Sequence, residues 1–288
     1  MIAVFKREFR DYMHNVVGWL FIAVLLLFIS IMSAYYNFLG GSTDITPALS
    51  FGEFVLILMV PILCMRSMTE DRRNRTDMFY LSLPVKTGSV VLGKYLALLA
   101  VFAIPTGVLC LYPLIFSLYG EVSFAASYAF LFSFFLMGAG IIALCMFLSS
   151  LTDHLVVSAV VGVGVLVLLY LFPIVGSLLP ESALASYIGF AVLALLLALV
   201  AYLTTRNPAV SFVTAAVLIL ALSAVYIWRP SALAGTFPLF AVSLSPFAQF
   251  EYMALYGLFD IRAIAVFLSY VVLFVFLTVQ KADRKRYL

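Results

Sequence analysis

The sequence predicts an all-α protein, a polytopic integral membrane helix bundle, and two observations lead to that class. Of its 288 residues, 66% are hydrophobic and only 10% are charged, with a mean hydropathy of +1.20. A soluble domain is nearer to half apolar and one quarter charged, so this chain cannot cover a globular surface with polar groups. Uncharged runs also recur at the length of about 20 residues that a helix needs to cross the hydrocarbon layer. We therefore expect lipid to cover most of the surface.

Eight such runs are present, and each is expected to form one spanning helix, because a helix satisfies its own backbone groups in lipid. They lie near residues 16–36, 48–65, 95–117, 124–149, 155–178, 184–204, 209–228 and 262–280. The second run is the weakest, since Glu53 interrupts it, and we expect this carboxyl group to lie at the outer interface or to face protein. The first run is too long for the apolar region of a cleavable signal peptide and is expected to remain in the protein.

The basic residues predict the orientation of the bundle. An even number of spans places both termini on one side of the membrane. With the N-terminus inside, every Lys and Arg except Arg229 and Arg262 falls in a cytoplasmic segment, and an excess of basic residues is typical of cytoplasmic loops. We expect cytoplasmic termini and a multi-pass protein of the bacterial inner (plasma) membrane. Losing the 184–228 pair would leave six spans with the same orientation.

Two further segments are expected to lie along the membrane surface. Residues 1–14 place Phe5, Phe9 and either Tyr12 or Met13 at helical spacing, with basic residues elsewhere, which is typical of an amphipathic interfacial helix. Residues 237–261 are apolar and aromatic but interrupted by two prolines and a glycine. They predict an outer-face interfacial or re-entrant segment, and their aromatic content agrees with a membrane-interface belt.

Residues 66–86 form the densest polar stretch of the chain. Six charged residues between positions 70 and 77 precede a short apolar and aromatic run, and Pro84 ends any helix there. A cytoplasmic helix with a charged front and an aromatic back is one that a partner protein could bind. A loop that only stops translocation would have the same composition, and the segment by itself leaves both interpretations open.

The remaining motifs exclude several kinds of chemistry. Residues 88–94 read GSVVLGK, like the start of a phosphate-binding loop, but Tyr95 replaces the Ser or Thr that binds magnesium and no α/β unit surrounds it. His14 and His154 are the only histidines, and the three cysteines lack metal-binding spacing. A net charge of +3 is too small to indicate nucleic acid. We expect no catalytic residue, no metal and no nucleic-acid partner.

Three blocks of the sequence resemble the ABC-2 permease family, particularly its gliding-motility and nitrous-oxide-maturation type. They are the opening KREFRDYMHNVVGWLF, the block of residues 66–94, and the closing SPFAQFEYMALYGLFDIRAIAVFLS with its basic tail. The middle block is the most specific and matches in Glu70, Thr76, Asp77, the turn at 81–85, Gly93 and Lys94. Arg75 replaces a common glycine, and residues 184–228 resemble an extra pair of spans beyond the usual six.

The resemblance implies the permease subunit of an ABC exporter. ATP and magnesium would then bind a separate cytoplasmic ATPase dimer, and a second permease copy or paralogue would complete the translocation path. A periplasmic accessory protein is a further possible partner. In the family, the loop helix inserts into a cleft of the ATPase subunit. The residues that this carries over as the coupling element are Glu70, Asp71, Arg72, Arg73, Thr76, Asp77, Met78, Phe79 and Tyr80. The substrate-binding residues stay unknown.

Three other functions are open. A secondary transporter driven by an ion gradient usually buries ionisable residues at the membrane midplane, whereas the acidic residues here fall near predicted span ends. An ABC complex could transmit force to periplasmic partners without transport, as some family members do. An intramembrane enzyme would need a catalytic pair, and Asp153-His154 fits a loop cap better. Uncharged spans and an aromatic outer segment favour an amphipathic, peptide or lipid-linked substrate.

Overall fold

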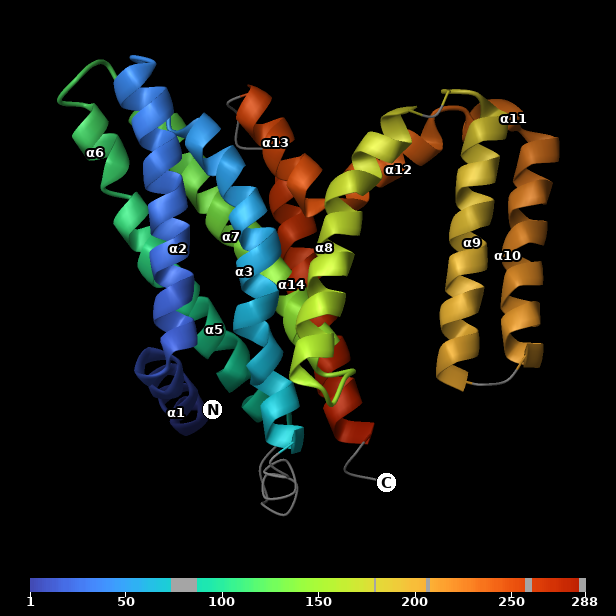
Figure 1. The fold of residues 1–288 in the computed structure, drawn as a ribbon. Helices are drawn as coiled ribbons and strands as arrows, with labels where there is room; N and C mark the ends of the chain where they lie inside the picture. Colours follow the sequence, from blue (N-terminus) through green and yellow to red (C-terminus); the bar gives the residue numbers. More distant parts are fainter. Residues whose placement is uncertain (74–86, 179, 206–207, 257–260, 285–288) are drawn as a thin grey trace. The chain divides into compact units, whose positions relative to one another are not determined.

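The structure, a computed structural model, describes residues 1–73, 87–178, 180–205, 208–256 and 261–284, and every regular element in these ranges is a helix (Figure 1). The helices are α1 (Ile2–His14), α2 (Val16–Ser33), η1 (Ala34–Leu39), α3 (Thr46–Arg73), α5 (Thr87–Leu109), α6 (Tyr112–Phe116), α7 (Phe124–Ser149), α8 (Leu155–Leu178), α9 (Ala183–Thr205), α10 (Pro208–Trp228), α11 (Pro230–Leu233), α12 (Thr236–Leu244), α13 (Pro246–Tyr256) and α14 (Ile261–Arg284). The predicted class, an all-α polytopic membrane helix bundle, is confirmed.

Six described helical segments are long and apolar enough to cross a membrane. They are Val16–Leu39, Thr46–Glu70, Thr87–Phe116, Phe124–Ser149, Leu155–Leu178 and Ile261–Asp283. Each contains or closely overlaps one of the predicted spans. The other two predicted spans coincide with α9 and α10, whose described apolar parts, Ala183–Leu195 and Ala215–Trp228, are shorter than a span. Six spans are therefore supported, and the additional pair stays a prediction.

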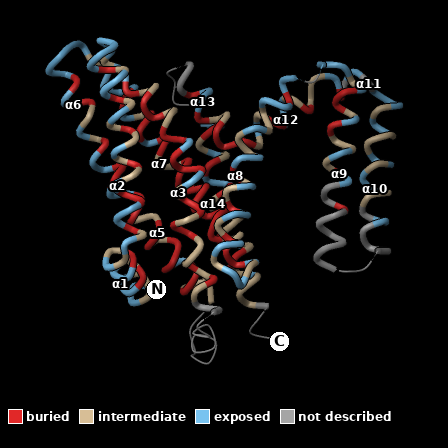
Figure 2. The backbone as a smooth tube through the Cα atoms, in the orientation of Figure 1, coloured by how far each residue is buried: buried red, intermediate tan, exposed pale blue. Residues whose placement is uncertain are grey.

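The chain divides into two compact units, Met1–Leu168 with Gln249–Leu288, and Leu169–Ala248. In the first unit α7 is the central helix, because it packs against α3, α14 and α5. Its apolar stretch is 78% buried, against 33% for that of α2 and 28% for that of α14, and Figure 2 shows buried residues concentrated along α7 and α3. Small residues permit this packing: a Cβ atom added at Gly140 would lie 3.2 Å from the Cβ of Tyr270 on α14.

The amphipathic segment at the N-terminus forms α1, which lies against α5 and α2 at one end of the first unit (Figure 1). Asn15 separates α1 from α2 because it adopts an extended conformation, and its side-chain oxygen accepts a hydrogen bond from the Val17 backbone N–H at 3.4 Å. Such a cap begins a new helix in a new direction. The buried residues of α1 are Glu8 and Tyr12. Its position at a membrane interface stays a prediction.

The second unit contains α9 to α12 and the end of α8. α9 and α10 pack against each other, with the rings of Tyr187 and Tyr226 centred 5.3 Å apart. Phe237 of α12 fills a notch on α9, because a Cβ atom at Gly189 would lie 2.6 Å from its ring, and it also meets the ring of Phe190 edge-on. These aromatic contacts, together with the hydrogen bond that the Phe237 backbone N–H donates to Ser186 Oγ at 3.5 Å, hold α9 to α12.

Residues 237–261 form two helices, α12 and α13, rather than one continuous segment. The break falls at Ser245, which is extended with φ −80° and ψ 121°, because the residue before a proline is disfavoured in the helical region, and Pro246 follows. Phe247, Phe250 and Met253 are buried. The outer-face or re-entrant placement of this segment stays a prediction, and residues 257–260 lie outside the described residues.

Candidate functional site

The predicted coupling residues belong to the chain that links α3 to α5. α3 ends at Arg73 and α5 begins at Thr87, so residues 66–73 continue a spanning helix instead of starting a separate loop. Glu70 is the one predicted site residue whose side chain the structure describes. Asp71, Arg72 and Arg73 lie in the last turn of α3, and Thr76, Asp77, Met78, Phe79 and Tyr80 lie outside the described residues. The geometry described below is therefore that of α3 and α5, the two helices that precede and follow residues 74–86.

Glu70 forms a bidentate ion pair with Arg66 one helical turn earlier. The Arg66 Nε and Nη2 atoms donate to the two carboxylate oxygens at 2.8 and 2.9 Å. The side chains of Arg66 and Glu70 are 27% and 38% exposed. A pair of this kind at i, i+4 adds only a few tenths of a kcal/mol, about 0.3–0.5 kcal/mol. It supports the helical form of the last turns of α3, and both carboxylate oxygens of Glu70 accept a hydrogen bond from Arg66.

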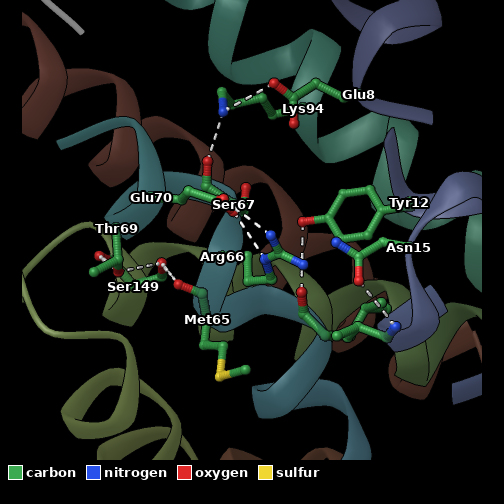
Figure 3. A network of polar contacts seen from close by, with 12 residues as sticks. Glu8, Tyr12, Asn15, Met65, Arg66, Ser67, Thr69, Glu70, Lys94 and Ser149 are labelled. Atoms are coloured by element: carbon green, nitrogen blue, oxygen red, sulfur yellow. Dashed lines mark hydrogen bonds and ion pairs between the residues drawn. The ribbon is translucent and has the colours of Figure 1, made fainter. Parts of the chain in front are cut away.

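Hydroxyl groups join the end of α3 to the end of α7 (Figure 3). Thr69 Oγ1 lies 3.1 Å from the carbonyl oxygen of Ser149 and 3.0 Å from its hydroxyl, and Ser149 Oγ donates to the Met65 carbonyl at 3.3 Å. Thr69 and Ser149 are both fully buried. The last carbonyls of a helix have no partner within the helix, so Thr69 satisfies one of them while it joins α3 to α7.

Lys94 joins three helices in the same region. Its ammonium group donates to the Ser67 carbonyl oxygen of α3 at 2.6 Å and lies 3.1 Å from a carboxylate oxygen of Glu8 on α1. The Lys94 side chain is only 3% exposed. A buried charge is tolerated when it is paired and hydrogen-bonded, and both conditions hold here. Figure 3 shows the Lys94 group bridging Glu8 and Ser67.

Two further features bring α1 close to these helices. Gly93 faces α1, since a Cβ atom there would lie 3.1 Å from the Met1 carbonyl oxygen and from the Val4 side chain. The Tyr12 hydroxyl donates to the Leu63 carbonyl of α3 at 3.4 Å. Burial raises the pKa of Tyr12 well above its usual value, so the phenol stays neutral and keeps the proton that it donates. The ends of α1, α3, α5 and α7 thus form one connected polar network, which we call the base network.

The base network also explains the GSVVLGK run. Residues 88–94 lie within α5, and the lysine that would contact phosphate in a nucleotide-binding loop is held by Glu8 and Ser67. Within the described ranges no group of three His, Cys, Asp or Glu side chains could hold a metal ion. Cys64 and Cys145 are buried free thiols.

Neither Glu8 nor the pairing role of Lys94 was predicted from the sequence. The signal was present, because Glu8 falls on the same helical face as Phe5, Phe9 and Tyr12, where an amphipathic pattern places apolar residues. A charged residue on that face predicts a buried partner. The pattern could not identify Lys94 as the partner. That residue is far away in the sequence, and a lysine at the cytoplasmic end of a span is expected in any case.

The fold and the base network define a multi-pass membrane protein in which the ends of two spanning helices, α3 and α5, are joined to α1. The family model described as ABC-2 family transporter protein matches residues 5–207, more than half of the chain. The chain belongs to the ABC-2 transporter family and is a permease subunit of an ABC transporter. Membership implies association with an ABC ATPase. No curated protein matches the chain.

Proposed function

We propose that this chain is the permease subunit of an ABC exporter in the bacterial inner membrane, and that residues 66–86 are its coupling element. Glu70, Asp71, Arg72, Arg73, Thr76 and Asp77 would meet complementary charges on the ATPase, and Met78, Phe79 and Tyr80 would supply the buried anchor, since aromatic side chains carry much of an interface's energy. ATP and magnesium would bind the ATPase dimer. Both termini of the permease would be cytoplasmic.

The base network is the observation that carries this proposal. Both helices that flank residues 74–86 are held by it: α3 through Thr69 and the Ser67 carbonyl, and α5 through Lys94. A displacement applied to the connecting segment would therefore reach α1 through Glu8 and α7 through Ser149. We expect helices joined in this way to move together, since rigid-body movement of packed elements is one established type of transition.

The mechanism that follows is mechanical. Closure of the ATPase dimer on ATP would shift the coupling element, and α1 with the ends of α3, α5 and α7 would move together. Reopening would return them. Two permease copies, or this chain and a paralogue, would line the path between them, and lipid would cover the remaining apolar surface.

The cargo class is proposed from the surfaces of the spans. The exposed side chains of the six long helices are overwhelmingly apolar, among them Leu27, Val160 and Val272 at 61%, 66% and 69% exposure. Such surfaces suit an amphipathic or lipid-linked substrate better than a small hydrated ion. The gliding-motility and nitrous-oxide-maturation type is the subgroup we propose, and a periplasmic accessory protein, or force transmission in place of transport, would be compatible with it.

The test is to purify the tagged full-length chain gently from its native membrane and to identify what accompanies it. We expect a stoichiometric ATPase. Phe79→Asp should abolish its recovery or uncouple ATP hydrolysis from transport, since a carboxylate cannot occupy an apolar anchor pocket, while Phe79→Leu should retain most of it. Both variants should insert in the membrane equally well.

Two outcomes would count against the proposal. A chain that purifies alone as a stable assembly, without a nucleotide-binding partner, would remove the ABC mechanism. Recovery, ATP hydrolysis and transport that Phe79→Asp leaves unchanged would show that the coupling element lies elsewhere.

A further inference from the structure

Glu53 is an ionisable side chain in the core of the first unit. It lies about two turns into α3, roughly 10 Å along the axis from its first residue, in a stripe with Leu49, Leu56 and Val60. These four residues recur at helical spacing, and all are 0% exposed. The position thus belongs to the packed face of the helix. Sequence analysis expected Glu53 near a span end, at the interface or facing protein, and it faces protein.

The carboxyl group has no hydrogen-bond partner. Neither Oε1 nor Oε2 of Glu53 finds a donor, although both are buried. In this it differs from Glu8, the other buried acid of the unit, whose carboxylate lies 3.1 Å from the Lys94 ammonium group. A buried polar group without a partner needs an explanation, and packing does not supply one, since leucine would fill the same position in the stripe.

Among the residues that the structure describes, the surroundings of Glu53 are apolar and contain no cation that could neutralise it. α2 has no titratable side chain, α7 has only Tyr128 and Cys145, and α8 has only Tyr170. On α5, the Lys94 ammonium group is engaged at the far end by Glu8 and Ser67. The aromatic rings of Phe134 and Phe250 pack beside this part of α3, with Phe134 3.3 Å from where a Cβ of Gly52 would lie.

The charges on the remaining helices do not offset this. α13 contributes Glu251, a second acid and not a cation, and burial raises the pKa of Glu251 itself. α14 has Arg262, already engaged in an interaction, in its first turn, Tyr270 farther along, and its other charged residues only in its last turn. An unpaired carboxylate in such a site is much less stable than the neutral acid.

We propose that Glu53 is a proton-binding site of the permease, which holds a proton in the packed bundle seen here and releases it when α3 separates from α7 and α13. The step is a simple dissociation: the carboxylic acid becomes a carboxylate, and the proton passes to water that enters between the helices. The O–H bond of the acid breaks, a water molecule takes up the proton as hydronium, and nothing is oxidised. The equilibrium between packed and opened bundle then depends on pH, with alkaline conditions favouring the opened form.

The link to transport rests on the proposed function, because α3 is the helix whose other end leads into the coupling element. The proton site itself does not depend on it. Leucine would pack at this position but could not respond to pH. The neutral form of Glu53 stabilises the packed bundle, and its charged form stabilises the opened bundle.

The first experiment is infrared spectroscopy of the purified full-length chain at neutral pH. We expect a carbonyl band of a protonated carboxylic acid, shifted in D2O, which Glu53→Gln removes. Glu121→Gln is the matched control, since Glu121 is exposed, and should leave the band in place. A wild-type spectrum without such a band, or a band that persists in Glu53→Gln, would overturn the proton site.

Thermal unfolding supplies an independent readout. The unfolded chain loses the Glu53 proton as the pH rises above about 4.3, whereas the packed bundle keeps it, so stability falls with rising pH on account of this group. Glu53→Gln mimics the neutral acid and removes that loss. The melting temperature of Glu53→Gln minus that of wild type should therefore increase from pH 5 to pH 8. A constant difference would contradict the proposal.

The third experiment separates the proton site from the transport mechanism. The pH dependence of ATP hydrolysis by the purified complex should be flattened in Glu53→Gln and retained in Glu121→Gln. If the infrared band is assigned to Glu53 but both variants keep the wild-type pH profile, the role of the proton in the cycle is overturned. If no ATPase accompanies the chain, the proposed function fails while the infrared and thermal results still decide the proton site.

Discussion

The Lys94 side chain shows how this protein tolerates a buried charge. Its ammonium group meets a carboxylate from α1 and a carbonyl oxygen from α3, so the charge is paired and hydrogen-bonded in one place. Glu53, on the same helix as that carbonyl, has neither kind of partner. The two acids therefore have opposite surroundings: Glu8 lies beside an ammonium group, whereas Glu53 has no such neighbour and, in our proposal, keeps its proton.

Removal of the Lys94 charge should destabilise the base network strongly. Lys94→Met leaves the Glu8 carboxylate in a site that is largely shielded from water, and loss of one partner of a buried pair costs about 3 kcal/mol or more. The double variant Glu8→Gln with Lys94→Met removes both charges and should recover more than half of that loss. The measurement is the thermal unfolding midpoint of each purified protein in the same detergent, which should be highest for wild type, lower for the double variant and lowest for Lys94→Met.

The control for this pair is Arg7→Met, because Arg7 pairs with Asp11 at 3.8 Å with both side chains more than half exposed. An exposed pair contributes little to stability, so the unfolding midpoint of Arg7→Met should stay near that of wild type. Equal destabilisation by Lys94→Met and by the double variant would mean that the ion pair is not what couples α1 to α3.

Among the helices, the close approach of α5 and α7 depends on one small residue. A Cβ atom at Gly138 would overlap the ring of Phe102. That ring cannot turn aside freely, because it is fully buried and packs against the rings of Phe21, Phe134 and Phe135. Position 138 of α7 thus has room only for glycine beside Phe102 of α5.

Gly138→Ala should separate α5 from α7 and lower stability by about 1–3 kcal/mol, the usual effect of overpacking a well-packed core. Gly107→Ala is the matched control on α5, since a Cβ atom there meets nothing within 4 Å. It should be neutral or slightly stabilising, because alanine has the higher helix propensity. Denaturation in mixed micelles compares the two, and similar effects at both positions would argue against a specific α5–α7 contact.

In the first unit as a whole, α1 and α6 lie at opposite ends of the bundle (Figure 1). The long helices between them place Arg7 and Tyr119 on opposite sides of any membrane that the bundle crosses. Tyr119 is 72% exposed, and the Arg7 side chain is 52% exposed. The positive-inside distribution assigns the Arg7 end to the cytoplasm, and this assignment is a prediction about the assembled protein in its membrane.

Cysteine labelling tests the orientation. In a Cys110→Ala background, a membrane-impermeant maleimide added to intact cells should label Tyr119→Cys and leave Arg7→Cys unlabelled until the membrane is opened. Leu27→Cys is the control for lipid burial, because Leu27 is exposed on the bundle surface within α2. It should not react with the maleimide in intact cells or after the membrane is opened. Labelling of Arg7→Cys in intact cells would reverse the orientation.

The same reagent decides whether α9 and α10 cross the membrane. If both are spans, Asn207→Cys should be protected in intact cells and Arg229→Cys should be labelled. If the pair lies outside the membrane on the outer side, both positions should react without opening the cells.

Much of the architecture follows from local sequence. The predicted runs at 124–149 and 155–178 have the same bounds as α7 and α8, because the length of an uncharged apolar run sets the length of a helix in lipid. The end of α3 was less predictable. Its charged residues read as the start of a loop, but the Arg66–Glu70 pair and the Thr69–Ser149 contact continue the helix to Arg73.

The coupling element was predicted only in part. Glu70 is placed by the structure, whereas Phe79 and its neighbours lie outside the described residues and remain predictions from the resemblance. The residues that hold the element's two ends, Thr69, Ser149, Lys94 and Glu8, were not predicted as a group. They come from four helices, and no spacing along the chain relates them.

The sequence by itself determined the class of the protein, the position of the long helices and the family to which it belongs. These depend on composition and on short-range patterns, because an apolar run forms a spanning helix when its length matches the thickness of the hydrocarbon layer. The tertiary structure decided which charges are paired. Glu8 and Lys94 meet, and Glu53 meets no cation, because helix packing places side chains that are far apart in sequence either beside each other or among apolar neighbours. The free energy of a buried charge depends on those neighbours, and only the packed bundle specifies them.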